Sequence, residues 1–229
     1  MRLDKFIANN TQLSRREVLY ALRRGAISIN GETANNIATK ISLDQNICLD
    51  GTPITERGGV YLMLHKPAGV VSVSHDSIHP TALDLIDNSE NLPLQIAGRL
   101  DIDTTGLLLI TDDGAWNHQL TAPRSGKQKR YRVHTAEPIT EEAITKFAEG
   151  VALHNEPRLT RPATLQIIAP TEALVILSEG KYHQVRRMFA AVGNYVIALH
   201  REAIGNIELD PALAPGQYRP LSAEEIASV

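Results

Sequence analysis

Four aspartates lie close together in residues 98–114, GRLDIDTTGLLLITDDG, on either side of an apolar run. Asp101 and Asp103 precede this run, and Asp112 and Asp113 follow it. A carboxylate can act as a nucleophile, as a general acid or base, or as a ligand of a metal ion. The spacing therefore suits several kinds of site, which the surrounding residues must distinguish.

The first kind of site is a calcium-binding loop of the EF-hand type. Its positions one, three, five, six and twelve would fall on Asp101, Asp103, Thr105, Gly106 and Asp112. However, the LLLIT between them is typical of a β-strand, and no helical pattern precedes the first aspartate. The twelfth position also carries aspartate, which is shorter than the glutamate that normally binds there. These features disfavour a calcium loop.

The second kind of site is a phosphoryl-transfer centre. DIDTT, residues 101–105, fits the D-x-D-x-T nucleophile motif of haloacid-dehalogenase-type phosphatases. In that family the acidic pair that holds magnesium follows a separate strand far down the chain, whereas Asp112 and Asp113 come almost at once. The preceding PLQIAGRL is also a poor hydrophobic strand for a nucleophile-bearing parallel sheet. The spacing argues against this chemistry.

Two helices are expected near the N-terminus. Ser14 and Glu17 match an S-x-x-E capping box at the start of a predicted helix over residues 14–25, which closes at Gly25. A shorter helix is predicted over residues 3–8.

Two strand-and-turn segments follow these helices. AISINGE and NICLDG contain Asn-Gly and Asp-Gly pairs, which are typical of tight turns between strands. The polar, glycine-rich segment 55–59 then marks the expected domain boundary. The sequence therefore predicts a small domain over residues 1–57 and a larger one over residues 60–229.

The larger domain is expected to alternate strands and short helices. VYLMLHKPAGVVSV predicts a strand, a turn and a second strand, and TGLLLITDDGAWNHQL predicts a strand that runs into a helix. Further strands are predicted at KRYRVHTA and EALVILSEG, and further helices at EEAITKFAEGV and HQVRRMFAAVG. Strands joined by turns and mixed with helices indicate an α+β fold, with a mixed, mostly antiparallel sheet flanked by helices.

The composition limits the class of protein. The net charge is −3, so basic surfaces must be local, and a single cysteine, Cys48, excludes an internal disulfide framework and a cysteine-based zinc cluster. The charged N-terminus, MRLDKFIANN, does not fit a signal peptide, and no run reaches the ~18–20 apolar residues of a membrane helix. We expect a cytoplasmic, monomeric protein with no membrane partner.

Four ordered motifs resemble those of pseudouridine synthases of the small-subunit rRNA type. GRLD at residues 98–101 is followed by Thr-x-Gly-Leu-Leu and then by Asp-Gly. KPAG at residues 66–69 matches the first motif of that family, K-x-Y-x-V at 129–133 matches the tyrosine motif, and EGKYHQVRRM at 179–188 matches the third. The N-terminal domain resembles the RNA-binding domain named after small-subunit ribosomal protein four. This resemblance covers nearly the whole chain, so it is far more specific than either five-residue match.

The resemblance implies an isomerase that converts a uridine of 16S rRNA to pseudouridine, with no cofactor and no metal ion. It implies that Asp101 is catalytic, that Lys181 is the cation that keeps this carboxylate ionised, and that Tyr131 stacks on the target base. The uridine must leave its stack to be reached, and Arg99 is expected to fill the space left behind or to hold a phosphate. Whether Asp101 attacks the base, attacks the sugar or removes a sugar proton stays open.

Several neighbours are expected to be structural. Asp103 and Thr105 are predicted to shape the loop by local hydrogen bonds, and Asp112 or Asp113 to begin the next helix. His183 is interpreted as structural because no paired ligand or Cys-His signature accompanies it.

Basic residues outside these motifs are expected to bind RNA phosphates, which give affinity and register rather than sequence choice. They comprise Lys5, Arg16, Arg23, Arg24, Lys127, Lys129, Arg130, Arg186 and Arg187. The expected partner is 16S rRNA or a partly assembled small ribosomal subunit. Action on large-subunit rRNA, or a non-catalytic role in ribosome assembly, remain alternatives.

Overall fold

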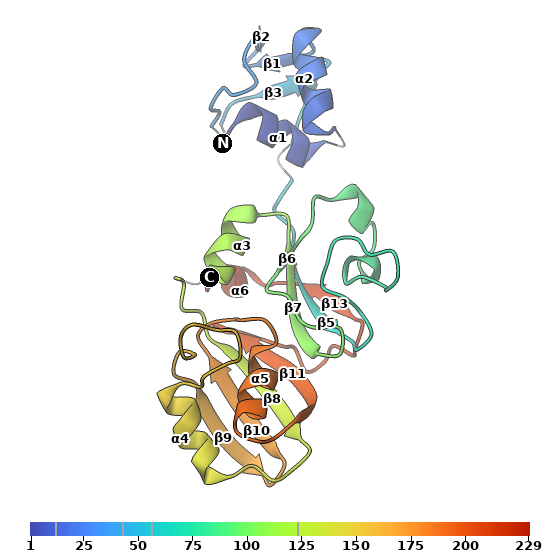
Figure 1. The fold of residues 1–229 in the computed structure, drawn as a ribbon. Coiled ribbons are helices and arrows are strands. Elements are labelled where there is room, and N and C mark those ends of the chain that lie inside the picture. Colours follow the sequence, from blue (N-terminus) through green and yellow to red (C-terminus); the bar gives the residue numbers. More distant parts are fainter. Residues whose placement is uncertain (12, 43, 56, 123) are drawn as a thin grey trace. The chain divides into compact units, whose positions relative to one another are not determined.

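The computed structural model describes residues 1–11, 13–42, 44–55, 57–122 and 124–229 (Figure 1). The chain divides into two compact units, Met1–Gly59 and Val60–Val229. Each unit has its own hydrophobic core.

The N-terminal unit packs two helices on a small antiparallel sheet. Helices α1 (Leu3–Asn10) and α2 (Arg15–Arg23) precede strands of order β2-β1-β3-β4, which are β1 (Ile27–Ile29), β2 (Glu32–Thr33), β3 (Ile47–Leu49) and β4 (Thr52–Pro53). The predicted capping box is present at α2, where the Ser14 hydroxyl accepts from the Glu17 amide. Asn30 and Asp50 have the positive φ values that their tight turns require. The predicted helices and turns of this unit are confirmed.

The C-terminal unit is built on one mixed sheet of order β13-β5-β7-β11-β8-β10-β9, to which β6 and β12 add at β7 and β11. Neighbouring strands run antiparallel except β7 and β11, which are parallel. The strands are β5 (Tyr61–Lys66), β6 (Gln95–Ala97), β7 (Thr105–Thr111), β8 (Lys129–Thr135), β9 (Thr164–Ala169), β10 (Glu172–Leu177), β11 (Val196–Ile204), β12 (Ile207–Glu208) and β13 (Tyr218–Pro220). The helices are η1 (Leu83–Leu85), η2 (Ser89–Asn91), α3 (Gly114–Thr121), α4 (Glu141–Glu149), α5 (Gln184–Ala191) and α6 (Ala223–Ala227). The predicted α+β fold with a mixed sheet is confirmed.

Strand β7 is buried on both faces, which explains its unbroken apolar run. Leu108 and Ile110 pack into one core cluster, and Leu107 and Leu109 pack into another with Trp116 of α3. Successive side chains of a strand point to opposite faces, so both faces of β7 must be covered. The strand thereby gives the loop that precedes it a rigid base.

Helices α4 and α5 pack with β8, β9 and β10 in a separate core (Figure 1). Phe147 of α4 and Phe189 of α5 meet edge to face, with ring centroids 5.1 Å apart. This contact fixes α5, and with it the chain segment that leads into its N-terminus.

One predicted strand is wrong. After Lys66 the chain does not form a second strand, and Val71 makes only an isolated bridge to Thr81. Instead, the Ser72 hydroxyl donates to the Leu100 carbonyl and accepts from the Leu100 amide. This segment therefore supports the loop before Asp101 rather than extending the sheet.

Candidate active site

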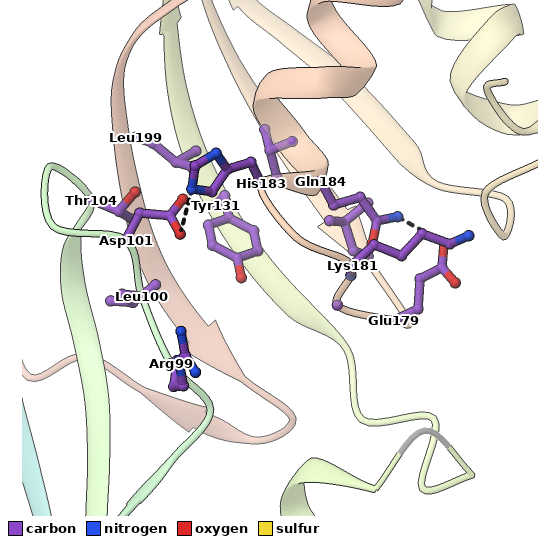
Figure 2. A pocket seen from close by; sticks show the side chains of 13 residues that line it. Arg99, Leu100, Asp101, Thr104, Tyr131, Glu179, Lys181, His183, Gln184 and Leu199 are labelled. Atoms are coloured by element: carbon purple, nitrogen blue, oxygen red, sulfur yellow. Dashed lines mark hydrogen bonds and ion pairs between the residues drawn. The ribbon is translucent and has the colours of Figure 1, made fainter. Parts of the chain in front are cut away.

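A pocket forms where the loop before β7, strand β8 and the start of α5 meet. Asp101 lines it from the loop, Tyr131 from β8, and Lys181 and His183 from the segment before α5. Figure 2 shows the Asp101 carboxylate facing the His183 ring, with Tyr131 beside them and Lys181 further along the wall. The structure thus brings together three motifs that are far apart in the sequence.

A buried ammonium group holds the loop on the C-terminal side of Asp101. Lys66 is 0% exposed, and its Nζ donates to the carbonyls of Pro67, Ile102 and Thr104 at 2.9, 3.3 and 2.8 Å. Burial lowers the pKa of Lys66 to about 8, an effect that the nearby carboxylates of Asp103 and Asp101 oppose. The lysine of the KPAG motif therefore acts as an anchor for the loop.

A buried guanidinium group holds the other side of the loop. Arg201 of β11 is 2% exposed and donates to the carbonyls of Gly98 at 2.7 Å, Arg99 at 3.4 Å and Leu107 at 2.9 Å. Arg201 and Gly106 are paired in the parallel register of β11 and β7. The carboxylate of Asp101 thus projects from a short loop that two buried cations fix at both ends.

The partner of Asp101 differs from the expected one. His183 Nε2 lies 3.4 Å from Asp101 Oδ1, whereas Lys181 Nζ donates to Glu156 Oε2 at 2.8 Å. Among the described residues, no ion pair joins Lys181 to Asp101. Lys181 lines the pocket as expected. However, its ammonium group pairs with Glu156, which lies outside the motif, instead of with Asp101.

His183, interpreted from the sequence as structural, lines the pocket and contacts Asp101. It has a left-handed backbone, with φ of +48°, directly before α5, and its ring stacks on Tyr182 at a centroid distance of 3.8 Å. Such a conformation is uncommon for a residue other than glycine, and at functional sites it can orient a side chain. The only available signal was its position within the third motif.

Tyr131 lines the pocket beside Asp101, as expected for a residue that stacks on the target base. It lies in β8, packs against two core clusters and remains half-buried at the pocket. Lys129, two positions earlier, lies on the same face of the strand, where burial lowers its pKa. Both side chains are therefore on the pocket side of the sheet.

Several basic residues expected to bind phosphate are engaged within the protein. Arg130, on the opposite face of β8, donates to Glu202 at 3.0 Å and to Glu208 at 3.1 Å. Arg186 pairs with Asp103 at 2.8 Å. The remaining engaged residues are Arg187 with Glu156, Lys127 with the Ser228 carbonyl, and Arg24 with Asp50. A phosphate that binds Arg130, Arg186, Arg187, Lys127 or Arg24 would therefore have to replace or share these contacts.

Other basic residues remain available to a ligand. Arg99 is exposed at the pocket rim, and Arg16 and Arg23 are exposed on α2. Lys5 on α1 is half-buried. No side-chain hydrogen bond joins the Arg99 guanidinium to another described residue.

The described residues contain no group of three or more histidine, cysteine, aspartate or glutamate side chains that could hold a metal ion. In the same residues, no helix is long and apolar enough to cross a membrane.

The pocket thus combines residues of the three motifs that resemble those of pseudouridine synthases, on a mixed α+β fold. Residues 60–191 match the RNA pseudouridylate synthase family, and the chain belongs to this family. It is 50% identical over 230 residues to ribosomal small subunit pseudouridine synthase A of Escherichia coli, a match that covers all of both chains. The protein of that name from Vibrio cholerae is 47% identical over 229 residues, which is 100% of this chain and 99% of the relative.

A solved structure supports the same assignment. A pseudouridylate synthase crystal structure matches with a TM-score of 0.72 and 43% identity, covering 100% of this chain and 99% of the other. The expected family, fold and enzyme class are thereby confirmed.

Proposed function

We propose that this enzyme converts a uridine of 16S rRNA to pseudouridine, with Asp101 as the reactive group. The observation that carries the proposal is the Asp101 carboxylate, held in a pocket beside Tyr131 by the buried cations of Lys66 and Arg201. The relatives that match over the full length are named as small-subunit enzymes, which favours 16S over 23S rRNA as substrate.

The reaction needs only rearrangement of bonds within one nucleotide. The bond between C1′ and the uracil nitrogen breaks, the base rotates, C1′ joins C5 instead, and the proton on C5 moves to a uracil nitrogen. A carboxylate can begin this sequence as a nucleophile or as a base. Tyr131 supports the extruded base by stacking, and His183 orients Asp101 through the 3.4 Å contact. Lys181 contributes a positive charge to the wall of the pocket.

We propose that a monomer acts in the cytoplasm on 16S rRNA or on a partly assembled small subunit. The predicted N-terminal domain, residues 1–57, supplies phosphate contacts through Lys5, Arg16 and Arg23, and residues 60–229 carry the chemistry. Arg99 and Lys129 contact the RNA near the pocket.

The substrate is tested by incubating the purified protein with unmodified 16S and 23S rRNA, free and partly assembled, and mapping pseudouridine at single-nucleotide resolution. We expect one modified position in 16S rRNA and none in 23S rRNA. Modification confined to 23S rRNA would assign the chain to large-subunit chemistry. Binding to 16S rRNA without any pseudouridine would favour the ribosome-assembly role.

Activity is expected to persist in excess chelator. Since the bond rearrangement requires no metal ion, chelation should change the rate less than about threefold, well below the effect of removing a catalytic metal. The measurement is pseudouridine formation in a short RNA that folds without magnesium, with and without chelator. A loss that only added magnesium restores would instead support the metal-dependent site considered for these aspartates.

The exposed arginines of α2 are expected to set salt-dependent RNA affinity. Replacing Arg16 and Arg23 together by alanine should weaken RNA binding and reduce the slope of log affinity against log salt by about 0.7–0.9 for each lost phosphate contact. The maximal rate should change little, because the pocket is not altered. Arg24→Ala is the matched control, since the Arg24 side chain is paired with Asp50. If Arg24→Ala and the double variant weakened RNA binding equally, the exposed arginines of α2 would not form a specific RNA-binding surface.

A further inference from the structure

Thr104, a residue that lines the pocket with Asp101, carries a buried hydroxyl without a hydrogen-bond partner among the described residues. The residue is 1% exposed and lines the pocket (Figure 2), and its Oγ1 has no hydrogen-bond partner among the described residues. A buried hydroxyl without a partner destabilises a folded protein. The hydrogen-bonding capacity of this hydroxyl is therefore not used by the described residues.

The backbone around this hydroxyl is fixed. The Thr104 amide donates to the Asp101 carbonyl at 3.1 Å, which closes a turn, and the Thr104 carbonyl accepts from Lys66 Nζ at 2.8 Å. A β-branched side chain also has little freedom at χ1. The hydroxyl is therefore held in place one turn from the reactive carboxylate.

The next residue provides an internal contrast. The Thr105 hydroxyl forms a hydrogen bond with His200 Nδ1 at 2.8 Å. His200 lines a different pocket from the one that contains Asp101. Of two adjacent threonines, Thr105 has a partner within the protein, whereas Thr104, which lines the pocket with Asp101, has none among the described residues.

We propose that the Thr104 hydroxyl forms a hydrogen bond with a polar group of the target uridine and orients that nucleotide against Asp101. This inference rests on the proposed role of Asp101. Uracil carbonyls, the imide N–H and the ribose 2′-hydroxyl can each pair with a group that both donates and accepts. Because the bond forms only after the base has left its stack, it serves the reaction, whereas phosphate contacts supply most of the RNA affinity.

The test compares Thr104→Val, Thr104→Ser and Thr105→Val with the wild type by kcat, RNA Kd and thermal unfolding. Thr104→Val removes only the hydroxyl from a similar shape, so kcat should fall roughly ten- to a hundredfold. Its RNA Kd should stay within about twofold, and its Tm should be unchanged or higher. Thr104→Ser should retain most of the activity. Thr105→Val should keep the wild-type kcat and lower Tm by about 2–4 °C.

The Asp101→Asn variant, assayed in parallel, separates this inference from the proposed site. If Asp101→Asn is inactive while Thr104→Val has the wild-type kcat, the Thr104 inference alone fails. It also fails if Thr104→Val and Thr104→Ser are equally impaired and both have lowered Tm, because the role is then structural. An active Asp101→Asn enzyme would overturn the proposed site itself.

Discussion

Asp101→Asn is expected to abolish pseudouridine formation while leaving RNA binding nearly intact. A general base typically contributes at least about a hundredfold to a rate, and loss of a nucleophile would remove turnover altogether. The side chain is partly exposed at the pocket, so the substitution should cost little stability. The measurements are single-turnover pseudouridine formation and RNA Kd, which should change less than about threefold because phosphate contacts dominate affinity.

Asp103→Asn is the matched control. The two carboxylates lie in one turn, but that of Asp103 is 61% exposed and pairs with Arg186 at 2.8 Å. We expect this variant to keep most of its activity, since a surface ion pair contributes little. A larger loss for Asp103→Asn than for Asp101→Asn would reverse the roles that we give these residues.

Among the substitutions considered, Gly106→Ala is expected to lower the free energy of unfolding most. A Cβ at this position would lie 2.3 Å from the Arg201 carbonyl oxygen and 2.7 Å from its nitrogen, and the backbone φ of +106° already disfavours a side chain. Strand β7 would have to separate from β11, which would displace the Arg201 guanidinium from the loop before Asp101. We expect a loss of more than about 4 kcal/mol in the free energy of unfolding and loss of activity in any folded fraction.

Gly193→Ala separates the steric clash from backbone strain. Gly193 has a similar positive φ of +84°, but no described atom lies within 4 Å of a Cβ built there. Its cost should be about 1–2 kcal/mol, the usual penalty for a side chain in this region. Urea unfolding followed by the fluorescence of Trp116, the single tryptophan, measures both variants. Equal costs would show that the close approach of β7 to β11 does not limit stability.

Local sequence signals predicted the elements that depend on neighbouring residues. The Ser14 capping box and the turn glycines act over a few residues, so α2 and the first hairpins could be inferred directly. The unbroken apolar run of β7 likewise follows from burial on two faces. The ordered motifs placed Asp101, Tyr131 and Lys181 in one pocket, where all three are found.

The remaining features depend on contacts between distant segments. Strand β11 has polar residues in its middle, including Arg201, so its central place in the sheet was not apparent from its composition. A buried cation whose partners are backbone carbonyls leaves no sequence pattern, because every residue has a carbonyl. The partner of Lys181 is Glu156, which lies outside every motif. The unpaired state of the Thr104 hydroxyl is visible only in three dimensions.

The role of Asp101 in 16S rRNA modification is tested most directly by mapping pseudouridine in the rRNA of cells that lack this protein, complemented with the wild type or with Asp101→Asn. We predict that one position in 16S rRNA loses pseudouridine, that the wild type restores it, and that Asp101→Asn does not. The 23S rRNA should be unchanged. An intact 16S map in the deleted strain would show that this protein does not modify 16S rRNA, and restoration of the modification by Asp101→Asn would show that Asp101 is not the reactive group.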